Sequence, residues 1–234
     1  MRILDGGMGD ILSERVGRKH ESDWSASCLT HSANHHLVVQ LHQEYIQCGA
    51  EWITTANFSL RRDHGYSDGE IYSGCLAAAT LAKQAVAATS AKVLGSLPPL
   101  GQCFLHKPVL HSSTQYDCMI SGLASCDWFL GETMSSLDEI MLVYDALERN
   151  QVEREWMVSF PVTARGTLYS GESCGQVVEH LLRLPKPPKA ILINCSPPEY
   201  ITTALESLVD WLRSIATMCP RKPLQHFVST APVG

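Results

Sequence analysis

The chain has 234 residues, of which 45% are hydrophobic and 18% are charged, so it can bury a large core in a single α/β domain spanning residues 1–234. The net charge of −6, with lysine and arginine dispersed along the chain, argues against a nucleic-acid-binding surface. No apolar run approaches the ~20 residues of a membrane span.

The nine cysteines are spread singly along the chain and form no Cys-x-x-Cys pair. An odd number of dispersed cysteines is untypical of a disulfide scaffold and fits reduced thiols. The first residues, Met1–Gly7, also lack the apolar stretch of a signal peptide. We therefore expect a soluble, cytoplasmic protein.

Short apolar runs alternate with amphipathic segments. The runs predict strands at Arg2–Leu4, Trp52–Thr55, Lys92–Leu97, Trp128–Glu132, Trp156–Pro161, Ala190–Ile193 and Leu224–Ser229. Repeated strand-then-helix units imply parallel strands with right-handed crossovers. A (β/α) barrel is the leading architecture, and a doubly wound sheet is the second.

Start signals mark several of the helical segments. A serine stands three residues before a Glu or Gln in Ser67–Glu70, Ser136–Glu139 and Ser173–Gln176, and this spacing predicts three capping boxes. The pair Pro197–Pro198 suits a first helical turn, where no amide donor is needed. The helix that follows is expected to bury one apolar face, formed by Leu205, Leu208, Val209, Leu212 and Ile215.

Polar residues follow several strands directly. The carboxyl ends of parallel barrel strands meet at one mouth, so we expect these residues to converge there: Asp5-Gly6-Gly7, Thr54-Thr55, Glu132 and Asn194-Cys195. The segment Gly101–Gln115 carries His106 and His111 and is expected to cover the mouth as a lid.

Each of these residues has more than one interpretation. The glycines after Asp5 either let the backbone approach a ligand or make a tight turn, and their spacing does not match GxGxxG. A carboxylate that ends a buried strand is costly unless paired, so Glu132 predicts a cationic ligand group, with Arg165 or Lys107 as alternative partners. Cys195 is a metal ligand, a nucleophile or a small buried hydrophobe. The histidines show no HExxH-like spacing, which argues against a histidine-rich metal site.

In chain order, these segments resemble the homocysteine S-methyltransferases. The similarity runs through Ile3–Gly9, Trp24–Ala26, Ile53–Asn57, Gly131–Thr133, Val158–Phe160, Ser170–Glu172 and Ile193–Pro198. It implies a (β/α)8 TIM-type barrel in which zinc binds the thiol of homocysteine. A methyl group then arrives from S-methylmethionine, S-adenosylmethionine or betaine, and methionine is formed.

The resemblance also implies roles for single residues. Cys195 would be a zinc ligand, and the amino group of homocysteine would be held by Asp5 and Glu132. The pocket would be lined by Gly6, Gly7 and Thr55.

The sequence departs from the family pattern at the metal. The family adds two adjacent cysteines in a glycine-rich turn after the last strand, and this sequence contains no Cys-Cys pair. Only seven strand signals are present, so we expect the barrel to lack its eighth strand and closing helix. Two functions stay open: a homocysteine S-methyltransferase, or a zinc-free relative that binds small molecules or acts as a scaffold.

Overall fold

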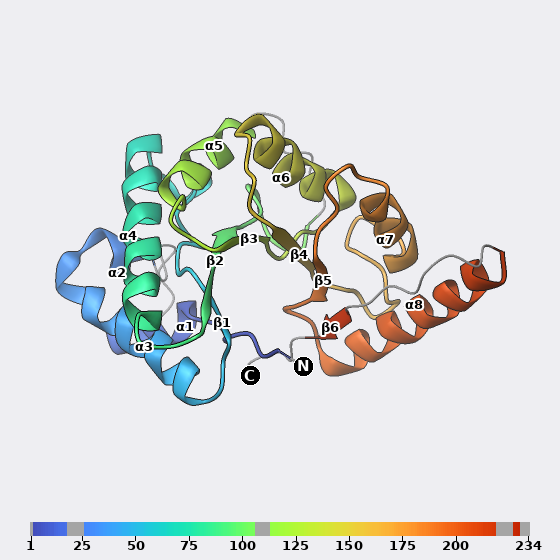
Figure 1. Cartoon of the computed structure of the whole chain (residues 1–234), viewed down its shortest axis with the longest axis horizontal. Coiled ribbons are helices and arrows are strands. Elements are labelled where there is room, and N and C mark those ends of the chain that lie inside the picture. The colour runs from blue at the N-terminus through green and yellow to red at the C-terminus, as the bar shows by residue number, and fades with distance from the viewer. Residues whose placement is uncertain (1, 18–25, 106–112, 219–226, 230–234) are drawn as a thin grey trace.

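The computed structural model describes residues 2–17, 26–105, 113–218 and 227–229. Within them, six parallel strands form one curled sheet in the order β1-β2-β3-β4-β5-β6 (Figure 1). The strands are β1 Trp52–Thr54, β2 Lys92–Leu97, β3 Trp128–Gly131, β4 Trp156–Phe160, β5 Ala190–Ile193 and β6 Phe227–Ser229. Each strand pairs with the next one in the chain, so the order never reverses as it does in a doubly wound sheet. The predicted α/β architecture with parallel strands is therefore confirmed, as a curled sheet, and the doubly wound alternative is excluded for the described strands.

Helices lie on the convex side of this sheet (Figure 1). Those that follow the strands are α4 Asp68–Val86, α5 Ser113–Gly122, α6 Leu137–Arg149, α7 Cys174–Leu182 and α8 Pro198–Met218. Before β1 come α1 Gly9–Arg15, α2 Ala26–Thr30 and α3 His35–Gln47, and short 3-10 turns occupy Ser32–Asn34 and Arg62–His64. None of the helices in the described ranges is long and apolar enough to cross a bilayer.

The predicted capping boxes form at two of the three sites. Ser67 and Ser173 each cap a helix reciprocally with the residue three positions on. The third prediction was wrong in part: Ser136 accepts from the Glu139 amide, but the Glu139 carboxylate instead accepts from the amide of Ser135, at 2.6 Å. The buried carboxylate reaches one residue further back, and this bond ties the β3–α6 loop down.

The helix predicted after Pro197 begins at Pro198. Its apolar face is narrower than expected: Leu208 is buried, Leu205 and Leu212 pack against the core, and Val209 is exposed. The side chain of Ile215 lies outside the described part of the structure.

The predicted strand at Arg2–Leu4 was wrong in extent. Only Leu4 bridges to Trp52, as an isolated parallel pair. The segment nevertheless runs beside β1, because the carbonyl of Ile3 accepts from the Glu51 amide at 2.8 Å and the Asp5 amide donates to the Trp52 carbonyl at 2.9 Å. The paired stretch is too short for a regular strand, but its hydrogen bonds carry Asp5 to the carboxyl end of β1.

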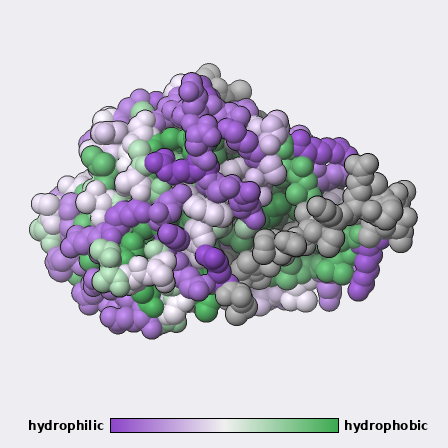
Figure 2. All heavy atoms as spheres, viewed as in Figure 1, coloured by the Kyte–Doolittle hydropathy of each residue, from purple (hydrophilic) through white to green (hydrophobic). Residues whose placement is uncertain are grey.

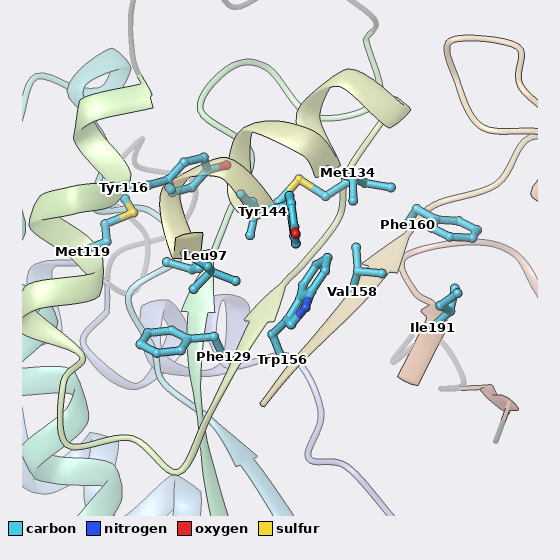
Figure 3. Close-up of a cluster of buried hydrophobic side chains, with 14 of the residues drawn as sticks. Leu97, Tyr116, Met119, Phe129, Met134, Tyr144, Trp156, Val158, Phe160 and Ile191 are labelled. Atoms are coloured by element: carbon cyan, nitrogen blue, oxygen red, sulfur yellow. The ribbon is translucent and has the colours of Figure 1, made fainter. Parts of the chain in front are cut away.

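The two faces of the sheet bury different sets of side chains. On the convex face, residues such as Leu97, Phe129, Val158 and Ile191 pack against the helices in the main core (Figure 3). On the concave face, an apolar layer takes one residue from each of five strands: Trp52, Leu94, Leu130, Met157 and Leu192. The surface seen in Figure 2 is mostly hydrophilic with smaller hydrophobic areas, so apolar side chains are concentrated inside.

Candidate functional site

A polar layer lies directly above the apolar layer of the concave face. Two residues further along each strand, on the same face because side chains alternate, the inward residue is polar. These residues are Thr54, Ser96, Glu132, Ser159 and Asn194. The carboxyl edge of the sheet is thus lined with hydroxyl, amide and carboxyl groups, where the sequence predicted a site.

Asp5 enters this layer from the segment beside β1. Its two carboxylate oxygens accept from the backbone amide of Thr54 at 2.8 Å and from the Thr54 hydroxyl at 3.0 Å. Burial raises the pKa of Asp5 from 3.8 to about 8; the Thr54 hydrogen bonds oppose the shift, and the Glu132 carboxylate adds to it. Asp5 and Glu132 therefore interact electrostatically across the mouth of the sheet.

Glu132 follows β3 and accepts a short hydrogen bond from the Ser96 hydroxyl at the end of β2. Burial raises the pKa of its carboxyl from 4.5 to about 7, and the Ser96 bond lowers it in part. Within the described residues, neither Glu132 nor Asp5 forms an ion pair with a basic side chain. Arg165, one suggested partner, is exposed and makes no such pair, and Lys107 lies outside the described residues.

Thr55 is turned into the protein. Its hydroxyl donates to the side-chain oxygen of Asn57 at 2.6 Å and accepts from the Ser96 amide at 2.9 Å. Asn57 in turn donates to the Ser96 carbonyl at 3.0 Å. Thr55 thus positions the serine that contacts Glu132, and a direct contact between Thr55 and substrate stays a prediction.

Gly7, the second glycine after Asp5, lies beside open space. A Cβ atom on Gly7 would meet no atom within 4 Å, and the Gly7 carbonyl accepts from the Tyr45 hydroxyl at 2.8 Å. Gly6 sits between Gly7 and Asp5 and is half-buried. The backbone here is fixed from one side and accessible from the other, which suits the approach of a ligand.

Cys195 lies at the end of β5 with its backbone in the left-handed region, at φ 48°. Its sulfur lies 3.9 Å from the hydroxyl oxygen of Thr133, and that hydroxyl accepts from the Asn194 side-chain amide at 2.9 Å. Cys195 is an exposed residue, so the interpretation as a small buried hydrophobe is wrong. Protein atoms around its sulfur still desolvate the thiol and raise its pKa to about 11, with a further contribution from Glu132. The structure therefore brings Cys195 within electrostatic range of Glu132.

Thr133 also adopts a left-handed backbone, at φ 60°. A β-branched residue rarely takes this conformation, and such residues cluster at functional sites. The Thr133 amide donates to the hydroxyl of Ser159, at 3.3 Å. Sequence reasoning did not single out Ser96 or Ser159, although each stands two residues after an inward apolar residue, Leu94 or Met157, in its strand.

A zinc ion needs four ligands, and usually three or more of them are protein side chains. Cys195 offers one thiol. In residues 2–17, 26–105, 113–218 and 227–229, no three His, Cys, Asp or Glu side chains come together as a metal site. The described residues alone therefore do not fit a zinc ion.

Comparison of the chain with known proteins identifies its family. The model of the family described as homocysteine S-methyltransferase matches residues 2–231. The chain belongs to the homocysteine S-methyltransferase family. The resemblance seen in the sequence is thereby confirmed, and the family is one of enzymes.

Two solved structures are similar to this chain in fold, and one curated protein is similar to part of its sequence. The metallated form of the homocysteine methyltransferase MmuM from Escherichia coli has a TM-score of 0.76 at 23% identity, covering 90% of this chain and 80% of that one. Its apo form gives 0.70 at 25% identity, covering 90% and 78%. Homocysteine S-methyltransferase 4 from Zea mays is 34% identical over 56 residues, which is 24% of this chain and 16% of the maize protein.

Proposed function

We propose that this protein binds homocysteine at the mouth of the curled sheet and transfers a methyl group to its thiol, giving methionine. The observation that carries the proposal is a pair of carboxyl groups, Asp5 and Glu132, at the carboxyl edge of the sheet. Among the described residues no basic side chain is paired to them, and the chain belongs to the homocysteine S-methyltransferase family.

The two carboxylates suit an amino-acid substrate. An ammonium group placed between Asp5 and Glu132 would favour their ionised forms and bring their raised pKa values down. A thiol without an amino group would leave the ionised carboxylates unpaired, and an unpaired buried charge is expensive. The site thereby selects homocysteine over simple thiols. Gly6, Gly7 and Thr55 are proposed to line the same pocket.

The methyl transfer itself needs little from the protein beyond positioning. The reacting form of homocysteine is the thiolate. It attacks the methyl carbon of a positively charged donor in line: the carbon–sulfur bond forms, the bond between methyl and donor breaks, and the donor leaves with the electron pair, uncharged at that atom. We propose S-methylmethionine, S-adenosylmethionine or a similar onium compound as the donor.

We propose Cys195 as the zinc-ligand position of this fold, where a bound zinc ion would lower the pKa of a coordinated thiol. Because no further ligands surround it in the described ranges, we expect this polypeptide to bind less than one zinc per chain. Metal analysis of the purified protein tests this. Tight one-to-one zinc that is lost in Cys195→Ser would show a complete site.

The same observation favours a second candidate function. A protein that holds homocysteine through Asp5 and Glu132 without a zinc-activated thiol would be a binding or scaffolding relative rather than a methyltransferase. The discriminating test is turnover of a donor carrying an isotopically labelled methyl group, followed by mass spectrometry of methionine. Labelled methionine from the wild type but not from Glu132→Gln supports the methyltransferase; homocysteine binding without any product supports the relative.

We further propose that the curled sheet is part of a (β/α)8 barrel, and that residues 1–234 act as one homocysteine-binding domain. We propose a cytoplasmic location, because none of the eight cysteines in the described part forms a disulfide. Limited proteolysis tests the single domain, since one protected fragment is expected.

A further inference from the structure

Two exposed aromatic side chains stand together on the loops above the site. Phe104 lies on the loop after β2 and is 40% exposed, and Tyr169 lies on the loop after β4 and is 37% exposed. Their rings meet edge to face, with centroids 5.6 Å apart. Large apolar side chains left in contact with solvent in this way are costly unless something uses them.

Both loops are tied to the segment that carries Glu132. The Phe104 amide donates to the Ser135 hydroxyl at 3.2 Å, while the Ser170 amide donates to the Ser135 carbonyl at 3.1 Å. Ser135 is three residues after Glu132. Phe104 also has a left-handed backbone, at φ 63°, an uncommon conformation for a bulky residue and one often found at functional sites.

The aromatic pair also lies close to the reacting centre. Burial raises the pKa of Cys103, the residue before Phe104; Arg61 lowers it, and Glu139 and Glu132 raise it further. Cys103 in turn adds to the pKa of Cys195. Through the bonds to Ser135, the two rings lie on loops beside the segment that carries Glu132.

Two carboxylates lie on the segments that hold the pair. The buried Glu139 carboxylate accepts from the Ser135 amide at 2.6 Å, beneath Phe104. Glu172 accepts from the Ser170 hydroxyl, beside Tyr169. The Arg61 guanidinium also acts on Cys103 and lowers its pKa, so the charge near Phe104 is mixed. The attraction for a cation comes from the faces of the two aromatic rings.

We infer that Phe104 and Tyr169 form a subsite for the positively charged methyl-onium group of the donor, holding it above the acceptor thiol. This inference rests on the proposed function and adds the residues that recognise the second substrate. Homocysteine would be held by its ammonium group at Asp5 and Glu132, and the donor would be held from the solvent side by the aromatic pair.

The test compares two ligands that differ in charge at one centre. S-methylmethionine and 2-amino-5-methylhexanoate have the same shape and the same amino-acid end, so any binding through that end cancels between them. We expect Phe104→Leu and Tyr169→Leu each to weaken S-methylmethionine binding by about two- to fivefold, the equivalent of one exposed cation–π contact. Binding of the neutral isostere should not change, and Tyr169→Phe should retain the wild-type preference because it keeps the ring.

Tyr72→Leu is the matched control, since Tyr72 is an exposed aromatic residue on α4, 44% exposed. Equal losses for both ligands, or no loss for either, would overturn the inference, as would a wild type that binds the sulfonium no better than the isostere. Homocysteine affinity is measured in the same variants and should be unchanged. If the wild type fails to bind homocysteine at all, the proposed function fails instead.

Discussion

The apolar and polar layers of the concave face lie on the same strands, two residues apart, and serve different purposes. Leu94 and Ser96 show the contrast on β2, and Leu130 and Glu132 show it at β3. The apolar layer lowers the free energy of the folded state by removing hydrocarbon from water. The polar layer places carboxyl groups where burial raises their pKa, so their ionised forms cost stability. One strand thus supplies stability at its middle and chemistry at its carboxyl end.

The largest expected effect is on the apolar layer. Leu94 is fully buried, so Leu94→Ala should lower the free energy of unfolding by about 2–5 kcal/mol, through lost burial and the cavity left behind. Urea denaturation measures it. Leu182→Ala, at an exposed leucine on α7, is the control and should have little effect. A fall of less than about 1 kcal/mol would show that the concave layer is not a packed core.

In the polar layer, we expect a substitution to weaken substrate binding without lowering the stability of the fold. Glu132→Ala should weaken homocysteine binding by about 2–4 kcal/mol, because the ammonium group loses a charged partner. The free energy of unfolding at pH 8 should be unchanged or higher, since a desolvated carboxylate is removed. Calorimetry and urea denaturation provide the two values, with Glu153→Ala, at an exposed carboxylate, as control. Unchanged homocysteine affinity would remove Glu132 from the site.

The two raised pKa values predict how the ligand-free protein responds to pH. Asp5 and Glu132 have folded-state pKa values of about 8 and about 7, above their ordinary values of 3.8 and 4.5. At pH values between the ordinary and the folded-state pKa, the folded state therefore binds more protons than the unfolded state. The free energy of unfolding should therefore fall as the pH rises from about 4 to about 8. Glu132→Gln should flatten this decline up to about pH 7, as measured by urea denaturation across the range. An unaltered slope in the variant would contradict the raised pKa of Glu132.

Homocysteine binding should depend on pH in the opposite direction. Its affinity should rise between about pH 6 and pH 8, by at most about tenfold per pH unit for each proton released, because ionised carboxylates hold an ammonium group better. Titration calorimetry in buffers of different ionisation enthalpy counts those protons. Binding without proton release at pH 7 would show that the carboxyl groups are already ionised.

The smallest effect is expected at Ser96. Its hydroxyl lowers the pKa of Glu132, so Ser96→Ala should raise that pKa further and weaken homocysteine binding at pH 7 by about 1 kcal/mol. Ser96→Thr keeps the hydroxyl, so it should retain the wild-type pKa of Glu132 and the wild-type affinity for homocysteine. NMR titration of the Glu132 carboxyl measures the shift, and a pKa that does not move would show that the hydrogen bond is unimportant.

The elements with strong local signals were predictable from the sequence. β2 and β5 have the bounds that were predicted, because each is an apolar run closed by turn-forming residues. The capping boxes at Ser67 and Ser173 formed because both hydrogen bonds are local. The placement of Asp5, Glu132 and Cys195 at the carboxyl edge of the sheet followed from the rule that parallel strands end at one mouth.

Other features could not be predicted because they depend on tertiary contacts. The left-handed backbone of Thr133 and Cys195 carries no glycine signal and is fixed by bonds between β3, β4 and β5. The strand expected at Arg2–Leu4 is too short to show a reliable pattern, and it pairs through a single bridge. The lid residues His106 and His111, and residues 224–226 of the last predicted strand, lie outside the described ranges.

The most direct test of the paired carboxylates compares homocysteine with 4-mercaptobutanoate, which lacks only the amino group, in the wild type and in Glu132→Gln. Titration calorimetry gives the preference for homocysteine in each protein. We predict a strong preference in the wild type that is largely lost in Glu132→Gln, while binding of 4-mercaptobutanoate does not weaken. An equal preference in both proteins would contradict the recognition of the substrate ammonium by Glu132.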